Sequence, residues 1–392
     1  MLDTKNIFAK RVEDLEGSAI REIFKLLGQS DIISLAGGSP AVESFPNQEL
    51  AQIARDLIAD KPEIALQYGV TEGYTPLREQ IKERMRKVNS VKDYDETIVT
   101  SGAQQAIDLV MRVLVEDGEG IVVEQPSFIG TLNSARSYNA RLFGVPVLED
   151  GLDLDALEHL LKTENIKLIY TIATFQNPTG ITMTNEKRRQ LVELANRYNV
   201  FILEDNPYGE LRFRGEPTDT IKSMDTEGRV IYCGSFSKIL SAGLRIGWMT
   251  AHKDIVEKVV VVKQVNDVHT AILNQMMASE YMKQYSIDEH IQKIRKLYGR
   301  KCALMLEAMD KYFPKTCTYT RPEGGLFLFC TMQEGADSVE VMKRATDNKV
   351  AFVPGHTFMI DIKKHTNTFR LNYSLVPEDK IEIAIKALAE VL

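Results

Sequence analysis

Short apolar runs alternate with amphipathic helical patterns through the middle of the chain, between about residues 97 and 233. Alternation at this spacing is typical of βαβ units, in which successive strands lie parallel. We therefore predict an α/β fold built on a doubly wound, mainly parallel sheet. The predicted strands are 97–100, 120–123, 141–145, 168–172, 201–204 and 230–233, and the helices between them are 127–138, 154–161 and 187–198, with one more after residue 102.

The pattern changes on either side of this region. Before it, helices are predicted at 47–60 and 75–87. After residue 252 we expect two long helices within 253–312, divided near 267–269, and then an α+β segment. That segment has predicted strands at 327–329, 350–353 and 368–373 and a last helix at 377–391. We predict a large domain of residues 46–285 and a small domain that combines residues 1–45 with 286–392.

Composition excludes several classes of protein. The formal net charge is −7, from 55 acidic and 48 basic residues, which gives no general electrostatic reason to bind nucleic acid or an anionic membrane. There is no apolar run long enough to span a membrane and no secretory signal pattern at the start. The four cysteines and six histidines lack metal-binding spacing, so we expect reduced thiols, a cytoplasmic protein and no metal site.

Three polar clusters, at 177–180, 205–208 and 235–238, each follow a predicted strand. Ligands of open parallel sheets bind at the carboxyl ends of the strands, so we expect the three clusters to converge on one crevice. The third cluster continues to Arg245 and places two hydroxyl groups, a guanidinium and an amine within a short stretch. Such a set can hold a phosphate with an amine beside it. Taken alone, an ordinary basic surface turn explains these residues equally well.

Other segments allow more than one reading. A strand, a turn at Gly102 and a helix follow one another at 97–110, an arrangement that points free N–H groups at an anion but is also common architecture. The paired Gly37 and Gly38 permit a close backbone approach or simply form a turn. Arg21 lies on the polar side of an amphipathic N-terminal helix, where a solvated arginine is the default interpretation.

Taken together, these residues resemble the class I/II aminotransferases of fold type I, which use pyridoxal 5′-phosphate (PLP). Five motifs occur in the family order, and the resemblance covers nearly the whole chain from about residue 18. They are Asn177-Pro178-x-Gly180, Asp205-x-x-Tyr208, Ser235-x-x-Lys238, Arg245 and Arg370. The runs at 18–27, 35–40, 66–74 and 235–245 are most similar to the α-aminoadipate/kynurenine aminotransferase II branch. The resemblance implies ping-pong transfer of an amino group from an L-amino acid (aminoadipate, aromatic or branched-chain) to a 2-oxo acid, with 2-oxoglutarate as the expected acceptor.

The resemblance also implies a role for each residue of the cofactor ring site. Lys238 forms a Schiff base with the cofactor and later moves the substrate Cα proton. Asp205 pairs with the ring nitrogen and keeps it protonated. Tyr208 and Asn177 donate to the ring oxygen. Phe128 stacks on the ring, at a position where the family often has tyrosine.

The remaining roles concern the phosphate and the substrate. The implied phosphate ligands are Gly102, Ala103, Gln104, Ser235, Ser237 and Arg245; related sequences often have serine in place of Ala103. Arg370, with Gly38 and Asn177, grips the substrate α-carboxylate, and Arg21 meets an acidic substrate side chain. Tyr68 matches a tyrosine that reaches the phosphate in the partner subunit, which implies a homodimer.

Two other functions share the same residues. A C–S β-lyase uses the same fold and cofactor and differs only around the substrate side chain. A PLP-binding regulator would join this domain to a winged helix, but the aminotransferase pattern begins within about 20 residues of Met1, so no DNA-binding domain is expected. We predict small-molecule partners, and no nucleic acid or membrane partner.

Overall fold

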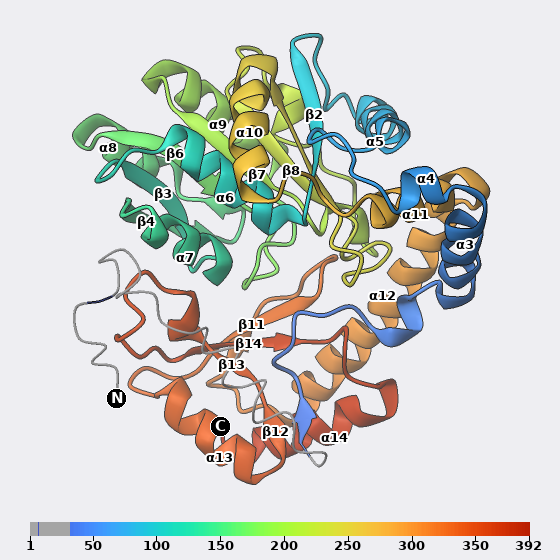
Figure 1. The fold of residues 1–392 in the computed structure, drawn as a ribbon. Coiled ribbons are helices and arrows are strands. Elements are labelled where there is room, and N and C mark those ends of the chain that lie inside the picture. Colours follow the sequence, from blue (N-terminus) through green and yellow to red (C-terminus); the bar gives the residue numbers. More distant parts are fainter. Residues whose placement is uncertain (1–6, 8–31) are drawn as a thin grey trace.

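The computed structural model describes residue 7 and residues 32–392. Its centre is an eight-stranded sheet in the order β2-β9-β8-β7-β6-β3-β4-β5 (Figure 1). The five strands from β8 to β4 run parallel, whereas β2, β9 and β5 pair antiparallel with their neighbours. The predicted mainly parallel sheet is therefore confirmed. Its strands are β2 (Asp95–Thr100), β3 (Gly120–Gln125), β4 (Arg141–Leu148), β5 (Gly151–Leu152), β6 (Ile166–Thr171), β7 (Phe201–Asp205), β8 (Val230–Ser235) and β9 (Gly247–His252).

Helices cover both faces of this sheet because each has one apolar stripe to bury. In α6, for example, five of the twelve residues are buried against the sheet and its neighbours, including Ile107 and Val110. The helices of this part are α3 (Asn47–Asp60), α4 (Pro62–Ala65), α5 (Thr75–Lys87), α6 (Ala103–Leu114), α7 (Ile129–Ser137), α8 (Leu154–Thr163) and α9 (Asn185–Tyr198). The predicted helices at 47–60 and 75–87 have these same bounds.

The tract 253–312 contains three helices, so the prediction of two was wrong. They are α10 (Lys253–Asn266), α11 (Ile272–Gln284) and α12 (Ile287–Tyr312). The second break lies at Tyr285, which is extended, and at Ser286, whose hydroxyl accepts a hydrogen bond from the Glu289 N–H at 3.2 Å. A serine followed three residues later by glutamate is a helix-start signal. Among the described residues, no helix is long and apolar enough to cross a membrane.

The C-terminal part forms a second, smaller sheet in the order β10-β11-β14-β13. Its strands are β10 (Thr318–Tyr319), β11 (Phe327–Thr331), β13 (Val353–Pro354) and β14 (Thr368–Asn372). The predicted strand 350–353 is divided at the fully buried Phe352, because β12 (Val350–Ala351) pairs instead with β1 (Ile33–Ser34). The helices here are η4 (Gly355–Phe358), α13 (Ser338–Asp347), which was not predicted, and α14 (Glu378–Ala389).

The pairing of β1 with β12 ties residues 33–34 to the C-terminal part of the chain, below the large sheet in Figure 1. Helix α12 extends from beside α11 to α14 and connects the two parts. The domain boundaries at residues 45 and 286 stay a prediction.

Candidate active site

The three polar clusters lie at the carboxyl ends of three adjacent strands. Asn177 follows β6, Asp205 is the last residue of β7, and Ser235 is the last residue of β8. Because β6, β7 and β8 are parallel neighbours, their ends open at one edge of the sheet. Arg370 on β14 and the segment that contains Gly38 approach this edge from the smaller sheet. Arg370 donates to the Asn177 side chain, and Lys238 donates to the Gly38 carbonyl.

Asp205 is a buried carboxylate with one oxygen unused. Its Oδ2 accepts a hydrogen bond from the Tyr170 hydroxyl at 2.8 Å, whereas Oδ1 is buried and has no hydrogen-bond partner in the described part of the chain. Burial, opposed by the Tyr170 hydrogen bond and aided by the nearby Glu124 carboxyl, raises the pKa of Asp205 to about 7. A buried acceptor left unpaired costs free energy, so this oxygen is suited to a cationic or N–H donor from a ligand.

Lys238 supplies an amine that loses its proton easily. Its Nζ donates to the Gly38 carbonyl at 2.6 Å. Burial, together with the positive charges of Arg370 and Arg245, lowers the pKa of Lys238 to about 8. An amine with a pKa near the pH of the cell is available both as a nucleophile and as a proton carrier.

Arg370 is fixed on several sides inside the protein. Its guanidinium donates to Asn177 Oδ1 and to the Ala36 carbonyl, both at 2.8 Å. The rings of Phe327 and Phe358 lie at 4.2 and 4.9 Å from its central carbon. Burial lowers the pKa of Arg370 to about 10, and its Nε has no partner among residues 32–392. A buried cation with a spare donor matches a carboxylate ligand.

Tyr208 lies close to Arg370, Asp205 and Asn177. It is 5% exposed, and its ring meets Phe327 edge-on at 5.7 Å. Burial raises the pKa of the Tyr208 hydroxyl, and the nearby Arg370 and a hydrogen bond with Asn177 lower it. The hydroxyl therefore keeps its proton and lies near Arg370, Asp205 and Asn177.

An anion cradle forms where α6 begins beside the 235–245 segment. Ser235 and Ser237 hydroxyls are 2.9 Å apart, and Arg245 Nη2 donates to the Ser101 carbonyl at 3.2 Å. Gly102 has φ +80°, and a Cβ there would collide with the Arg245 guanidinium. The positive φ strains any residue with a Cβ, so glycine is favoured at this helix start.

Ala103 and Gln104 are the first two residues of α6, which has no side-chain N-cap within the described chain. The Gln104 side chain is turned toward α7 and donates to the Gly130 carbonyl at 3.2 Å. The backbone N–H groups at this helix start remain available to an anion. Phe128 caps the start of α7, partly buried, with its ring folded over Gly130.

Two predicted residues are not brought to this crevice by the described structure. Tyr68 is 81% exposed and contacts His269 edge-on, with ring centroids 5.8 Å apart. Arg21 lies outside the described residues.

The comparisons with known proteins agree with this geometry. A family model described as "Aminotransferase class I and II" matches residues 30–388. The chain is a class I/II aminotransferase. The aminotransferase is 41% identical to "Aromatic-amino-acid aminotransferase 1" of Thermococcus litoralis, with 100% of this chain and 95% of that protein covered.

Two solved structures are similar along their whole length. The kynurenine aminotransferase of Pyrococcus horikoshii, in complex with PMP, kynurenine and its product, is 40% identical, with a TM-score of 0.95 and coverage of 99% and 97% of the two chains. The alpha-aminoadipate aminotransferase of Thermus thermophilus, complexed with N-(5′-phosphopyridoxyl)-L-leucine, is 36% identical, with a TM-score of 0.92 and coverage of 100% and 98%. The aminotransferase therefore has the type I fold and uses PLP, and its activity is transamination.

The described residues fit this cofactor. PLP presents a ring nitrogen that can carry a proton, an aldehyde that reacts with an amine, and a phosphate. The unpaired Asp205 Oδ1 suits the protonated ring nitrogen, and the Lys238 amine suits the aldehyde. The cradle around Gly102 and Arg245 suits the phosphate.

Four residues of this site were not found from the sequence. Tyr170 and Glu124 surround Asp205, and Phe327 and Phe358 enclose the Arg370 guanidinium. Phe327 and Tyr170 lie inside predicted strands, where an aromatic residue is expected for packing alone. Pairing of distant strands places them at the site, and no local signal marks that role.

Proposed function

We propose that Lys238, Asp205 and Arg370 are the residues on which transamination depends. The observation that carries the proposal is their convergence: an amine of lowered pKa, a buried carboxylate with an unpaired oxygen, and a caged guanidinium at one edge of the sheet. When bound, PLP supplies the electron sink for the pair released as the substrate Cα–H bond breaks.

The chain's own residues bind, orient and move protons around that cofactor. Asp205 holds a proton on the ring nitrogen, and Tyr208 and Asn177 donate toward the ring oxygen. Phe128 covers one ring face. The phosphate is bound by the backbone of Gly102, Ala103 and Gln104 together with Ser235, Ser237 and Arg245.

The substrate is oriented by its α-carboxylate. Arg370 holds this group, and Asn177 and the Gly38 backbone complete the carboxylate site. With the carboxylate fixed, the Cα–H bond faces Lys238, whose amine takes the proton from Cα and returns it on the cofactor side. The Lys238 Nζ already donates to the Gly38 carbonyl, so the amine lies beside the proposed carboxylate site.

The amino donor proposed here is an L-amino acid of the aminoadipate, aromatic or branched-chain type, and 2-oxoglutarate is the proposed acceptor. Similar proteins favour this range, since they include an aromatic-amino-acid aminotransferase and a 2-aminoadipate transaminase. Arg21 is the proposed partner of an acidic donor side chain. We also propose that the enzyme acts in the cytoplasm, where its four buried, free cysteines stay reduced.

A donor panel tests these specificity proposals. Aminoadipate, glutamate, phenylalanine and leucine are each assayed with 2-oxoglutarate. Arg21→Ala is expected to raise KM for the two acidic donors by about tenfold, because a charge-assisted pair is lost, and to leave leucine unchanged. Arg55→Ala, on the exposed side of α3, is the matched control.

Two outcomes of the panel count against the proposal. Normal use of aminoadipate and glutamate by Arg21→Ala, with leucine impaired, contradicts the role of Arg21. If no donor passes its amino group to 2-oxoglutarate while another 2-oxo acid is accepted, the acceptor is wrong.

The enzyme is further proposed to be a homodimer in which Tyr68 reaches the phosphate of the partner's cofactor. An exposed apolar strip supports an interface at this place. Leu66, Tyr68 and Val70 are 65%, 81% and 57% exposed. Val265, four residues before the His269 that Tyr68 contacts, is 76% exposed. Apolar groups gathered in this way usually mark a contact surface.

Subunit mixing tests this arrangement. Tyr68→Phe is expected to weaken PLP binding about tenfold, since one hydrogen bond to a charged group is lost, whereas Tyr285→Phe is not. Refolding Tyr68→Ala together with Lys238→Ala should restore activity at limiting PLP that neither variant has alone, because one site of each mixed dimer is intact. Failure of the mixture to gain activity, with mixed dimers shown to form, would place Tyr68 in its own subunit's site.

A further inference from the structure

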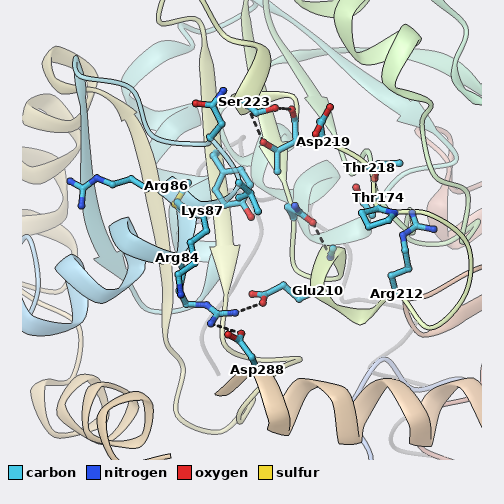
Figure 2. A pocket seen from close by; sticks show the side chains of 18 of the residues that line it. Arg84, Arg86, Lys87, Thr174, Glu210, Arg212, Thr218, Asp219, Ser223 and Asp288 are labelled. Atoms are coloured by element: carbon cyan, nitrogen blue, oxygen red, sulfur yellow. Dashed lines mark hydrogen bonds and ion pairs between the residues drawn. The ribbon is translucent and has the colours of Figure 1, made fainter. Parts of the chain in front are cut away.

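A cavity of about 1050 Å³ lies away from the site described above. It is enclosed by the C-terminal half of α5, the segment 206–224 and the start of α12. Figure 2 shows Arg84, Arg86 and Lys87 of α5 on one side and Thr174, Arg212, Thr218 and Asp219 on the other.

The cavity and the cofactor site lie on opposite faces of the same strand ends. Asp205 and Ser235 belong to the cofactor site, whereas their chain neighbours Asn206 and Phe236 line the cavity. Successive side chains of a strand point to opposite faces, so this alternation is what two separate sites on one sheet edge require. Asn206 also joins the two strands, since its N–H donates to the Cys233 carbonyl at 2.8 Å.

Aromatic rings form the floor of the cavity, although they expose little surface to it: Phe236, Trp248 and Tyr232 are 1%, 7% and 8% exposed. Phe236 and Trp248 have ring centroids 5.2 Å apart, and Tyr232 and Trp248 6.4 Å apart. Trp248 is held in place because its indole N–H donates to Met85 Sδ at 3.2 Å. A rigid aromatic floor favours a ligand with a flat apolar part.

The walls are basic, although the whole chain has a net charge of −7. Seven Arg or Lys side chains line the cavity but only three Asp or Glu. Three of these cations are paired: Arg84 with Glu210 and Asp288, as Figure 2 shows, Arg189 with Glu186, and Arg212 with Glu323. Arg86 and Lys87 are exposed and form no ion pair with any described residue, so no described carboxylate neutralises them.

We propose that this cavity is a second ligand site, which binds a small organic anion that carries an aromatic ring. The ring lies toward Tyr232, Phe236 and Trp248, and the anionic group lies toward Arg86 and Lys87. Small-molecule sites usually combine apolar and aromatic side chains with convergent polar groups, and cations near an aromatic ligand add a further attraction.

The chain carries its own reporter for this site, because Trp248 is its single tryptophan. The probe is 1-anilinonaphthalene-8-sulfonate, and N-phenyl-1-naphthylamine is the matched neutral probe with the same rings. The protein is the PLP-loaded enzyme reduced with borohydride, so that the catalytic site stays filled. The sulfonate is expected to quench Trp248 fluorescence saturably, by energy transfer, and more tightly than the neutral probe.

Charge and volume are then varied separately. Arg86→Gln with Lys87→Gln is expected to weaken sulfonate binding about fivefold and to reduce its salt dependence. Lys363→Gln with Lys364→Gln removes the same charge from an exposed segment elsewhere and should change nothing. Thr218→Phe, which fills the cavity, should weaken both probes.

Three results would overturn the proposal: no energy transfer from Trp248, equal affinity for the two probes, or sulfonate binding that Thr218→Phe leaves unchanged. Binding that falls equally in the two double variants would also overturn it, because general surface attraction then explains the affinity.

Discussion

Lys238→Ala is expected to abolish transamination, with a loss of at least about 10³-fold in kcat. General acid–base catalysis by a positioned group contributes roughly this much, and the variant also loses the nucleophile that holds the cofactor covalently. The visible absorbance of the lysine-bound cofactor should disappear. Neither effect needs a change in the fold, because Lys238 has one polar contact in the described structure, to the Gly38 carbonyl.

Controls separate this role from loss of a positive charge. Lys238→Arg keeps a cation at the position and should be as inactive as Lys238→Ala. Lys258→Ala, on the exposed side of α10, should retain full activity and absorbance. A cofactor adduct that borohydride still fixes to another lysine in Lys238→Ala would show that the assignment of Lys238 is incorrect.

Much of the large sheet could be predicted because its signals are local. The parallel strands are short apolar runs, and the helices α7, α8 and α9 that lie between them in the chain are amphipathic; both patterns are contained in a few neighbouring residues. The strand β9, which begins at Gly247, was not predicted. It is buried between β2 and β8 as an antiparallel strand, which the βαβ pattern does not describe.

The residues of the site also fall into two groups, those with a local signal in the sequence and those without one. The predicted residues Asn177, Asp205 and Ser235 stand at strand ends, and sequence order alone brings parallel strand ends together. The enclosure of Arg370 by Phe327 and Phe358 depends on pairing within the smaller sheet and on the position of η4. Such contacts join segments far apart in the chain, so no spacing in the sequence reveals them.

Asp205→Asn is expected to separate stability from function. Burial raises the pKa of Asp205 from its usual 3.8 to about 7, so the folded, cofactor-free protein holds a proton that the unfolded chain has already released. Ionisation of Asp205 therefore lowers the free energy of unfolding of the cofactor-free protein progressively as the pH rises from 3.8 to about 7. The contribution of Asp205 to stability is largest below this range, where the carboxyl is protonated in both states. At pH 8 the isosteric amide should raise the Tm of the cofactor-free protein by about 2 to 5 °C.

With PLP bound, the effect should reverse. The amide cannot hold a proton on the ring nitrogen, so kcat should fall by at least about 10²-fold, and PLP should raise the Tm of Asp205→Asn less than that of the wild type. Glu204→Gln is the matched control, because Glu204 is an equally buried carboxyl of β7 but accepts from the Ile221 and Lys222 N–H groups instead. It should lower the Tm and leave PLP binding intact. If Asp205→Asn lowers the Tm of the cofactor-free protein at pH 8 but not at pH 5, ionised Asp205 stabilises the fold, and its unpaired oxygen is not a place kept for the cofactor.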